Sequence, residues 1–139
     1  MRSATVLSHQ LDGKFSIISE AEFTLEVLMP NRYHYTVEKL TGAIDCLATH
    51  PGDVRERLTC AFLGFHTLTE KDFPSELQAD WRWVMNELTR YGPLLNHKGE
   101  VWIGSVENTM RRIRKATGSK IAKKIYELYW AVSENQPYL

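Results

Sequence analysis

Hydrophobic residues follow two different spacings along the chain. Near the N-terminus, two apolar segments flank Asp12-Gly13, a pair suited to the positive φ angles of a tight hairpin turn. Apolar and polar residues then alternate over 21–29, as in a half-buried strand. Ser19 and Glu22 also have the spacing of a helix capping box. We favour the strand, so this part predicts a β-hairpin or, with the third segment, a three-stranded meander.

After residue 35 the apolar residues recur every three or four positions, which is the period of an amphipathic helix. Breaking and capping residues divide this part into five helices. The breaks and caps are Pro51-Gly52, Asp53, Phe73-Pro74, Gly92-Pro93 and Thr117-Gly118-Ser119. The residues expected to face inward are Val37, Leu40, Ile44, Leu47, Ala48, Val54, Leu58, Ala61, Phe62, Phe65, Leu68, Leu77, Trp81, Val84, Leu88, Tyr91, Val106, Met110, Ile113, Ile121, Ile125, Leu128 and Val132.

The expected fold is mainly α, with about five helices around one core and a small N-terminal β-hairpin or three-stranded meander. We expect a single domain over 1–139, made of a β-rich N-terminal element (1–30) and a helical core (35–135). Segment 94–104 carries turn-forming residues and is expected to be a loop with a short extended piece at 101–103. A chain of 139 residues can bury a core without a metal or a disulfide.

Charge is balanced overall but uneven along the chain. Seventeen basic and seventeen acidic residues give a formal net charge of zero, so any electrostatic steering must come from local asymmetry. The segment 110–124 contains no acidic residue, and its basic residues are Arg111, Arg112, Arg114, Lys115, Lys120, Lys123 and Lys124. This segment predicts a solvated face, a face that meets the acidic third helix within the fold, or a surface for phosphates or an acidic protein.

Three large aromatic residues fall outside the apolar stripes of their helices. Tyr126 and Trp130 lie opposite the stripe of the fifth helix, and Trp83 lies outside that of the third. They indicate either a second packing face or an interface, because Trp, Tyr and Arg are enriched at interface centres. A DNA-reading helix-turn-helix around Gly118 is disfavoured, because Arg114 stands where a small residue is needed and Lys124 where a core residue is needed.

Two cysteines and two histidines lie near the first helix break. Cys46, His50, Cys60 and His66 do not have a common zinc-site spacing, so we expect no metal and no cofactor. We expect both cysteines to be free thiols in a reducing compartment. The chain has no apolar run of about 18 residues and no signal-peptide core, so we place it in the cytoplasm rather than in a membrane.

These observations favour a non-enzymatic interaction protein that docks on a protein or ribonucleoprotein partner through a basic and aromatic surface on its last two helices. Small inhibitors and adaptors of phages or mobile elements belong to this functional class. The alternative is a nucleic-acid-binding protein that contacts phosphates through segment 111–124. A small Cys/His enzyme is the third hypothesis, with Cys46 or Cys60 as nucleophile. A homodimer is compatible with any of them.

Overall fold

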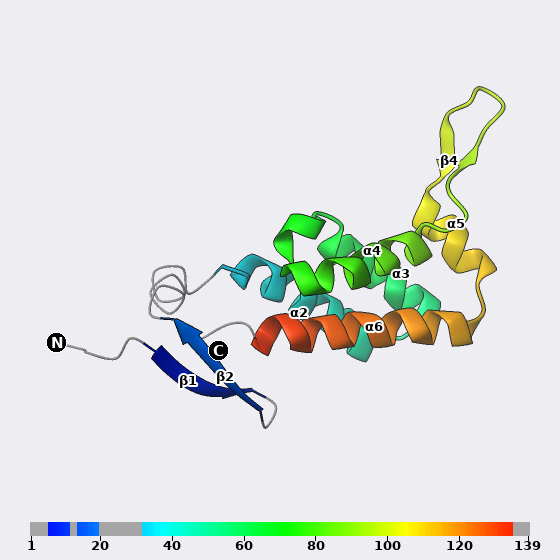
Figure 1. Ribbon diagram of the computed structural model, residues 1–139. Helices are drawn as coiled ribbons and strands as arrows, with labels where there is room; N and C mark the ends of the chain where they lie inside the picture. Colours follow the sequence, from blue (N-terminus) through cyan, green and yellow to red (C-terminus); the bar gives the residue numbers. More distant parts are fainter. Residues whose placement is uncertain (1–5, 12–13, 20–31, 135–139) are drawn as a thin grey trace.

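A computed structural model describes residues 6–11, 14–19 and 32–134, and Figure 1 shows its elements. This part of the chain is mainly helical, as predicted. The elements are β1 (Val6–Leu11), β2 (Lys14–Ser19), α2 (His34–Thr49), α3 (Val54–Phe65), the 3-10 turns η1 (Glu70–Asp72) and η2 (Ser75–Leu77), α4 (Gln78–Leu88), β3 (Leu94–Leu95), β4 (Val101–Ile103), α5 (Ser105–Arg112) and α6 (Lys115–Glu134). Within the described residues, no helix combines the length and the apolar character needed to cross a membrane.

The two N-terminal strands pair antiparallel, from Val6 opposite Ser19 to Leu11 opposite Lys14. The expected turn at 12–13 and the expected third strand at 21–29 lie outside the described residues. The N-terminal β element as a whole therefore stays a prediction.

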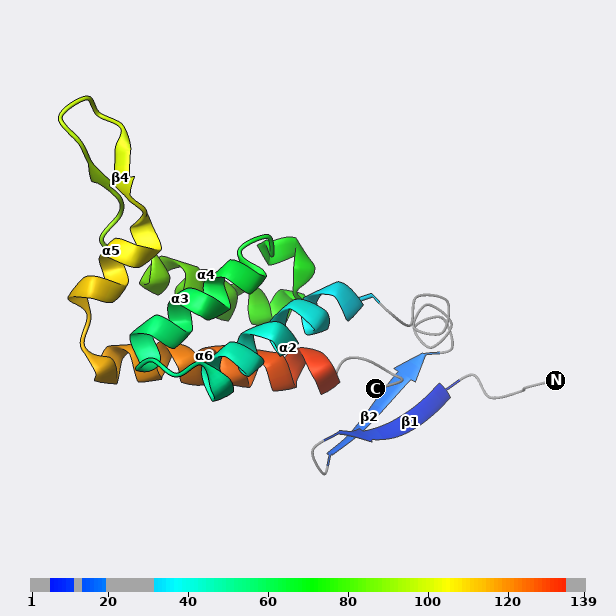
Figure 2. The same ribbon diagram turned by 180° about the vertical axis from the view of Figure 1, so that it is seen from behind.

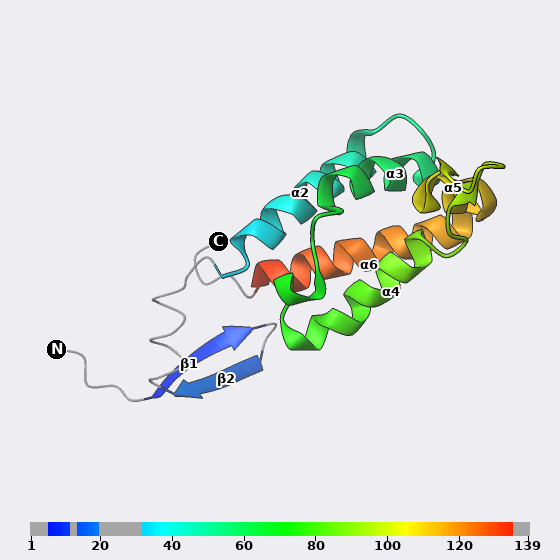
Figure 3. The ribbon, with the colours of Figure 1, turned by 90° about the horizontal axis from the view of Figure 1, so that it is seen from above.

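Helices α2, α3 and α4 pack around α6. This helix lies between α2 and α3 on one side and α4 on the other, as Figure 3 shows from above. Its side chains Ile121, Ile125, Leu128 and Val132 are buried at 0–1% exposure, in agreement with the predicted stripe. Two predicted inward residues are wrong: Ala48 and Tyr91 are both exposed, Tyr91 at 46%.

Aromatic rings close one region of the core. Trp81 of α4 stacks on Phe73 with ring centroids 4.7 Å apart, and it meets Phe65 of α3 edge-on at 5.1 Å. All three side chains are at most 2% exposed. Such pairs contribute about 0.5–1.5 kcal/mol beyond their buried area. The core therefore includes the loop between α3 and α4 through Phe73.

The cap predicted for the second helix is confirmed. The Asp53 carboxylate accepts hydrogen bonds from the backbone N–H groups of Arg55 and Glu56, and the Glu56 side chain accepts one from the Asp53 N–H at 3.3 Å. The Arg55 side chain also donates to this carboxylate, and its hydrogen bond is the main reason that the pKa of Asp53 falls from 3.8 to about 2. A negative charge is therefore kept at the N-terminus of α3, where the helix dipole favours it.

The break predicted at Thr117-Gly118-Ser119 is wrong. The helix ends earlier, at Arg112, and Gly118 lies inside the first turn of α6. A Cβ atom on Gly118 would stand 2.9 Å from Cγ1 of Val54, so the glycine lets the start of α6 approach α3. Arg55 strengthens this junction by donating from Nη1 to the Ile113 carbonyl at 3.3 Å. Gly118 therefore serves a helix contact and does not end a helix.

Candidate functional site

The predicted basic segment divides into partnered and unpartnered cations. Arg111 forms an ion pair with Glu107 of the same helix, with 2.7 Å between Nη2 and Oε1. Arg112 donates from Nε to Asn108 and lies 5.4 Å from the centre of the Tyr91 ring. Both arginines are thus engaged at α5, and they offer less free charge than their positions in the sequence suggest.

Lys124 connects α6 to the acidic helix α4. Its Nζ lies 3.8 Å from Asp80 of α4 and 3.4 Å from Glu127 of its own helix. The alternative in which the basic segment meets the acidic third helix thus holds for this lysine. Its side chain is 31% exposed, so solvent weakens the two ion pairs.

Within the basic segment, four cations have no carboxylate partner in the described part of the chain. They are Arg114, Lys115, Lys120 and Lys123, and all four are exposed. Arg114 lies at the α5–α6 junction and the three lysines lie on α6. The local positive charge therefore belongs to α6 and its N-terminal approach.

One exposed strip of α6 carries both free cations and aromatic rings. Turns of 3.6 residues place its five members within about 80° of one another on the helix surface. We call them the outer strip, and they are Lys115, Ser119, Lys123, Tyr126 and Trp130. Tyr126 and Trp130 are 52% and 50% exposed, and their rings meet edge-on at 6.2 Å. The lysines occupy the first part of the strip, and its aromatic residues follow at about 16 Å and 22 Å from Lys115 along the helix.

Trp83 does not belong to this strip. It lies on α4 and is 39% exposed. The flank of α6 that faces α4 is marked by Lys124, and helical geometry places Tyr126 and Trp130 about 160° and 120° around the helix from it. The predicted binding set therefore spans at least two separate faces.

A projecting hairpin is a candidate surface that the sequence interpretation missed. Strands β3 and β4 pair antiparallel, Leu94 opposite Ile103 and Leu95 opposite Val101, so that Trp102 is the extra residue of a β-bulge. The hairpin stands out from the helical bundle in Figures 1 and 2. Trp102 is 71% exposed, Val101 64% and Leu95 57%. Only the short extended piece at 101–103 had been expected here.

Hydrogen bonds hold this hairpin in place at both ends. At its turn, Oδ1 of Asn96 accepts from the N–H groups of Lys98 and Glu100, and Gly99 has a φ of +79°. At its base, the Asn108 side chain of α5 donates to the Gly92 carbonyl at 2.9 Å. Asn108 is only 2% exposed, so this hydrogen bond is buried. The hairpin therefore presents its apolar residues from a defined position.

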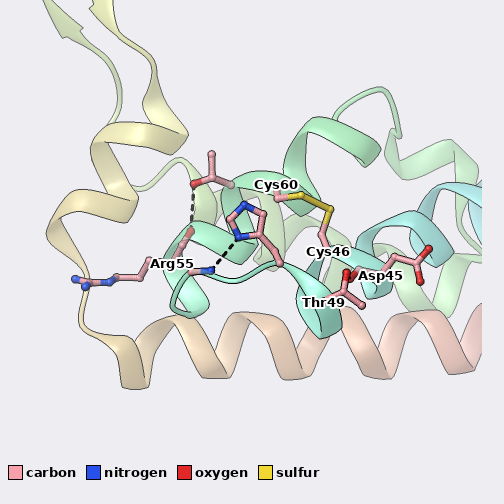
Figure 4. The surroundings of a disulfide bond; sticks show 8 residues. Asp45, Cys46, Thr49, Arg55 and Cys60 are labelled. Atoms are coloured by element: carbon pink, nitrogen blue, oxygen red, sulfur yellow. Dashed lines mark hydrogen bonds between the residues drawn. A yellow bond between two sulfur atoms is a disulfide. The ribbon is translucent and has the colours of Figure 1, made fainter.

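The cysteine and histidine corner is not the predicted pair of free thiols. Cys46 of α2 and Cys60 of α3 form a disulfide with their Cα atoms 5.8 Å apart (Figure 4), so the expectation of free thiols is wrong. Nδ1 of His50 accepts from the Gly52 N–H, and His66 contacts the Leu63 carbonyl. Neither sulfur is then a thiolate that could attack a substrate or bind zinc.

Comparison with known proteins adds no functional information. No family model matches the chain, and no match is found among curated proteins or solved structures. In the described residues, no group of three or more His, Cys, Asp or Glu side chains is arranged to hold a metal ion. The candidate sites are therefore the outer strip and the projecting hairpin, and both are surfaces rather than clefts.

Proposed function

We propose that this protein is a non-enzymatic interaction protein that docks on a partner protein, alone or within a ribonucleoprotein, through the outer strip of α6. The observation that carries the proposal is the continuous exposed strip of Lys115, Lys123, Tyr126 and Trp130. Large aromatic side chains contribute most of the binding energy at interface centres, whereas surrounding charges set orientation and association rate.

The strip defines the chemistry of the partner. Tyr126 and Trp130 require an apolar pocket, because each buries a large ring on binding. Lys115 and Lys123 require carboxylates, placed on the side of that pocket toward the start of α6. A partner with an apolar pocket beside an acidic rim fits both requirements, and docking would block or position it.

A paired capture experiment tests the surface. The full-length protein is immobilised, and partners from native lysate are quantified for the wild type and for Lys123→Glu/Trp130→Ala. The matched control is Lys71→Glu/Trp83→Ala, which removes the same residue types from exposed positions outside the strip. We expect the strip variant to lose at least tenfold of a bound partner that the control retains. Equal capture by all three proteins would refute the proposal.

Nucleic-acid binding is the second candidate, favoured by the four cations without carboxylate partners. Phosphate binding releases counterions, so the affinity must fall steeply with salt. A gel shift with duplex and single strands at about 50 mM and 200 mM salt would reveal it. Binding that is lost in Lys120→Glu/Lys123→Glu would favour this candidate, and no shift at the lower salt would remove it.

The disulfide weakens two other predictions, the Cys/His enzyme and the cytoplasmic location. The Cys/His enzyme loses its nucleophile, because Cys46 and Cys60 are joined. The cytoplasmic location stays a prediction, and the cysteines no longer support it, because disulfides persist mainly in oxidising compartments.

A further inference from the structure

The projecting hairpin lacks the support that two-stranded sheets normally need. An isolated pair of strands is marginal in water unless further strands or a helix cover its apolar side. Here Leu95, Val101 and Trp102 are more than half exposed. Figures 1 and 2 show the hairpin extending away from the helices. Its apolar residues are therefore not covered by the part of the chain that the structure describes.

A groove lies at the base of the same hairpin. It has a volume of about 460 Å³, and its lining includes Thr59, Phe62, Leu63, Gly104, Val106 and Glu107. Leu63 is 69% exposed. Trp102 lies only two residues before Gly104, so the protruding side chain and the groove are neighbours on the chain. The volume is within the range of pockets that enclose a large organic group.

We propose that the hairpin and the groove form a self-complementary interface between two copies of this chain, with Trp102 of each copy in the groove beside Leu63 of the other. An interface with a twofold axis requires that one surface carry both complementary parts, and this surface does. The axis would pass close to the hairpin base, because the two parts lie side by side there. This interface is separate from the outer strip and goes beyond the proposed partner docking.

Charge on the two parts is also complementary. Lys98 at the hairpin turn is exposed and has no carboxylate partner in the described structure. A second hollow shares Thr59 and Glu107 with the groove. In that hollow Glu107 pairs with Arg111 and Asp53 pairs with Arg55, so the acidic group left for Lys98 of the other copy is Glu56, which is exposed and forms no ion pair in the described structure. A net charge of zero adds no general repulsion between copies. Tyr91 is not part of the apolar contact, because Arg90 and Arg112 already lie near its ring.

Sedimentation equilibrium of the full chain tests the proposal. At about 100 μM we expect a dimer, since that concentration saturates an interface with a micromolar Kd. Trp102→Glu and Leu63→Lys should each weaken dimerisation about 30-fold, as expected for the loss of an interface anchor. Trp130→Glu is the control, because it changes an exposed Trp on a different element. Both altered side chains are about 70% exposed, so circular dichroism should report unchanged folding.

Mixing the two weakened variants gives the decisive result. In an equimolar mixture at about 10 μM, where a micromolar Kd weakened about 30-fold leaves each variant mostly monomeric, one contact restores Trp102 against Leu63 and the other pairs the new Glu with the new Lys. The mixture should therefore contain more dimer than either variant alone. A wild type that stays monomeric at about 100 μM would overturn the proposal. So would dissociation caused by Trp130→Glu, or a mixture with no more dimer than either variant alone. These outcomes are independent of the capture experiment, which changes neither the hairpin nor the groove.

Discussion

Replacement of Gly118 by alanine tests how α6 is placed against α3. In an exposed helix, a change from glycine to alanine stabilises by up to about 1 kcal/mol, because alanine loses less backbone entropy on folding. Gly42 of α2 offers that baseline, since nothing lies within 4 Å of a Cβ built there. We expect Gly42→Ala to raise the free energy of unfolding by up to about 1 kcal/mol.

The same change at Gly118 meets a packed neighbour. The new Cβ would lie 2.9 Å from Cγ1 of Val54, which is closer than side chains normally approach. It would lie 3.5 Å from Cδ1 of Leu58, which is an ordinary contact. Overpacking of this kind costs about 1–3 kcal/mol, which offsets or exceeds the helix gain. The net effect should lie between about zero and a loss of 2 kcal/mol. The two alanine variants should therefore differ by about 1–3 kcal/mol.

Urea unfolding followed by circular dichroism measures this difference. With a slope near 2 kcal/mol per molar, the midpoints of the two variants should differ by about 0.5–1.5 M. A double-mutant cycle with Val54→Ala identifies the contact, because Gly118→Ala should become stabilising once Cγ1 is gone. If Gly118→Ala stabilises the native background as much as Gly42→Ala does, the close approach of α6 to α3 is wrong.

Two further predictions concern the α2–α3 corner. The Cys46–Cys60 disulfide joins residues that are 14 positions apart in the sequence. A closed loop of about 15 residues corresponds to about 3 kcal/mol of stabilisation, so reduction of the disulfide should lower the urea midpoint by about 1.5 M. The double variant Cys46→Ala/Cys60→Ala should not respond to reductant, and an unchanged wild-type midpoint would contradict the cross-link. Because the pKa of Asp53 is lowered from 3.8 to about 2, its ionised form stabilises the fold above pH 4 and this contribution is lost as the pH falls toward 2. The stability gap between wild type and Asp53→Asn should narrow over that window, and a gap independent of pH would show that the carboxylate charge contributes nothing.

Local signals explain why the helices could be predicted. Helical period and capping residues act over a few positions, so they are visible in the sequence before any tertiary contact exists. The stripe of α6 and the capping box at Asp53 are of this kind, and both are confirmed. The start of α4 is displaced by only one turn from Phe73-Pro74, because a 3-10 turn precedes the helix.

Contacts between elements explain the errors. Gly118 resembles a helix breaker until Val54 of α3 is placed against it, and no local pattern contains that contact. The disulfide likewise depends on how α2 and α3 pack across the turn between them. The ion pair between Arg111 and Glu107 was in reach of sequence reasoning, because residues four apart meet on a helix, whereas the one between Lys124 and Asp80 was not.

The four tryptophans show where sequence reasoning about function reaches its limit. Helical period separates buried Trp81, at 2% exposure, from Trp83 and Trp130, at 39% and 50%. Trp102 has no period to interpret, because β4 has three residues and the bulge shifts its register. Burial nevertheless divides their roles: loss of Trp81 would remove core packing and change stability, whereas Trp102 and Trp130 contribute little to the core. Substitutions at these two positions can therefore change association without changing folding, which makes the two proposed surfaces experimentally separable.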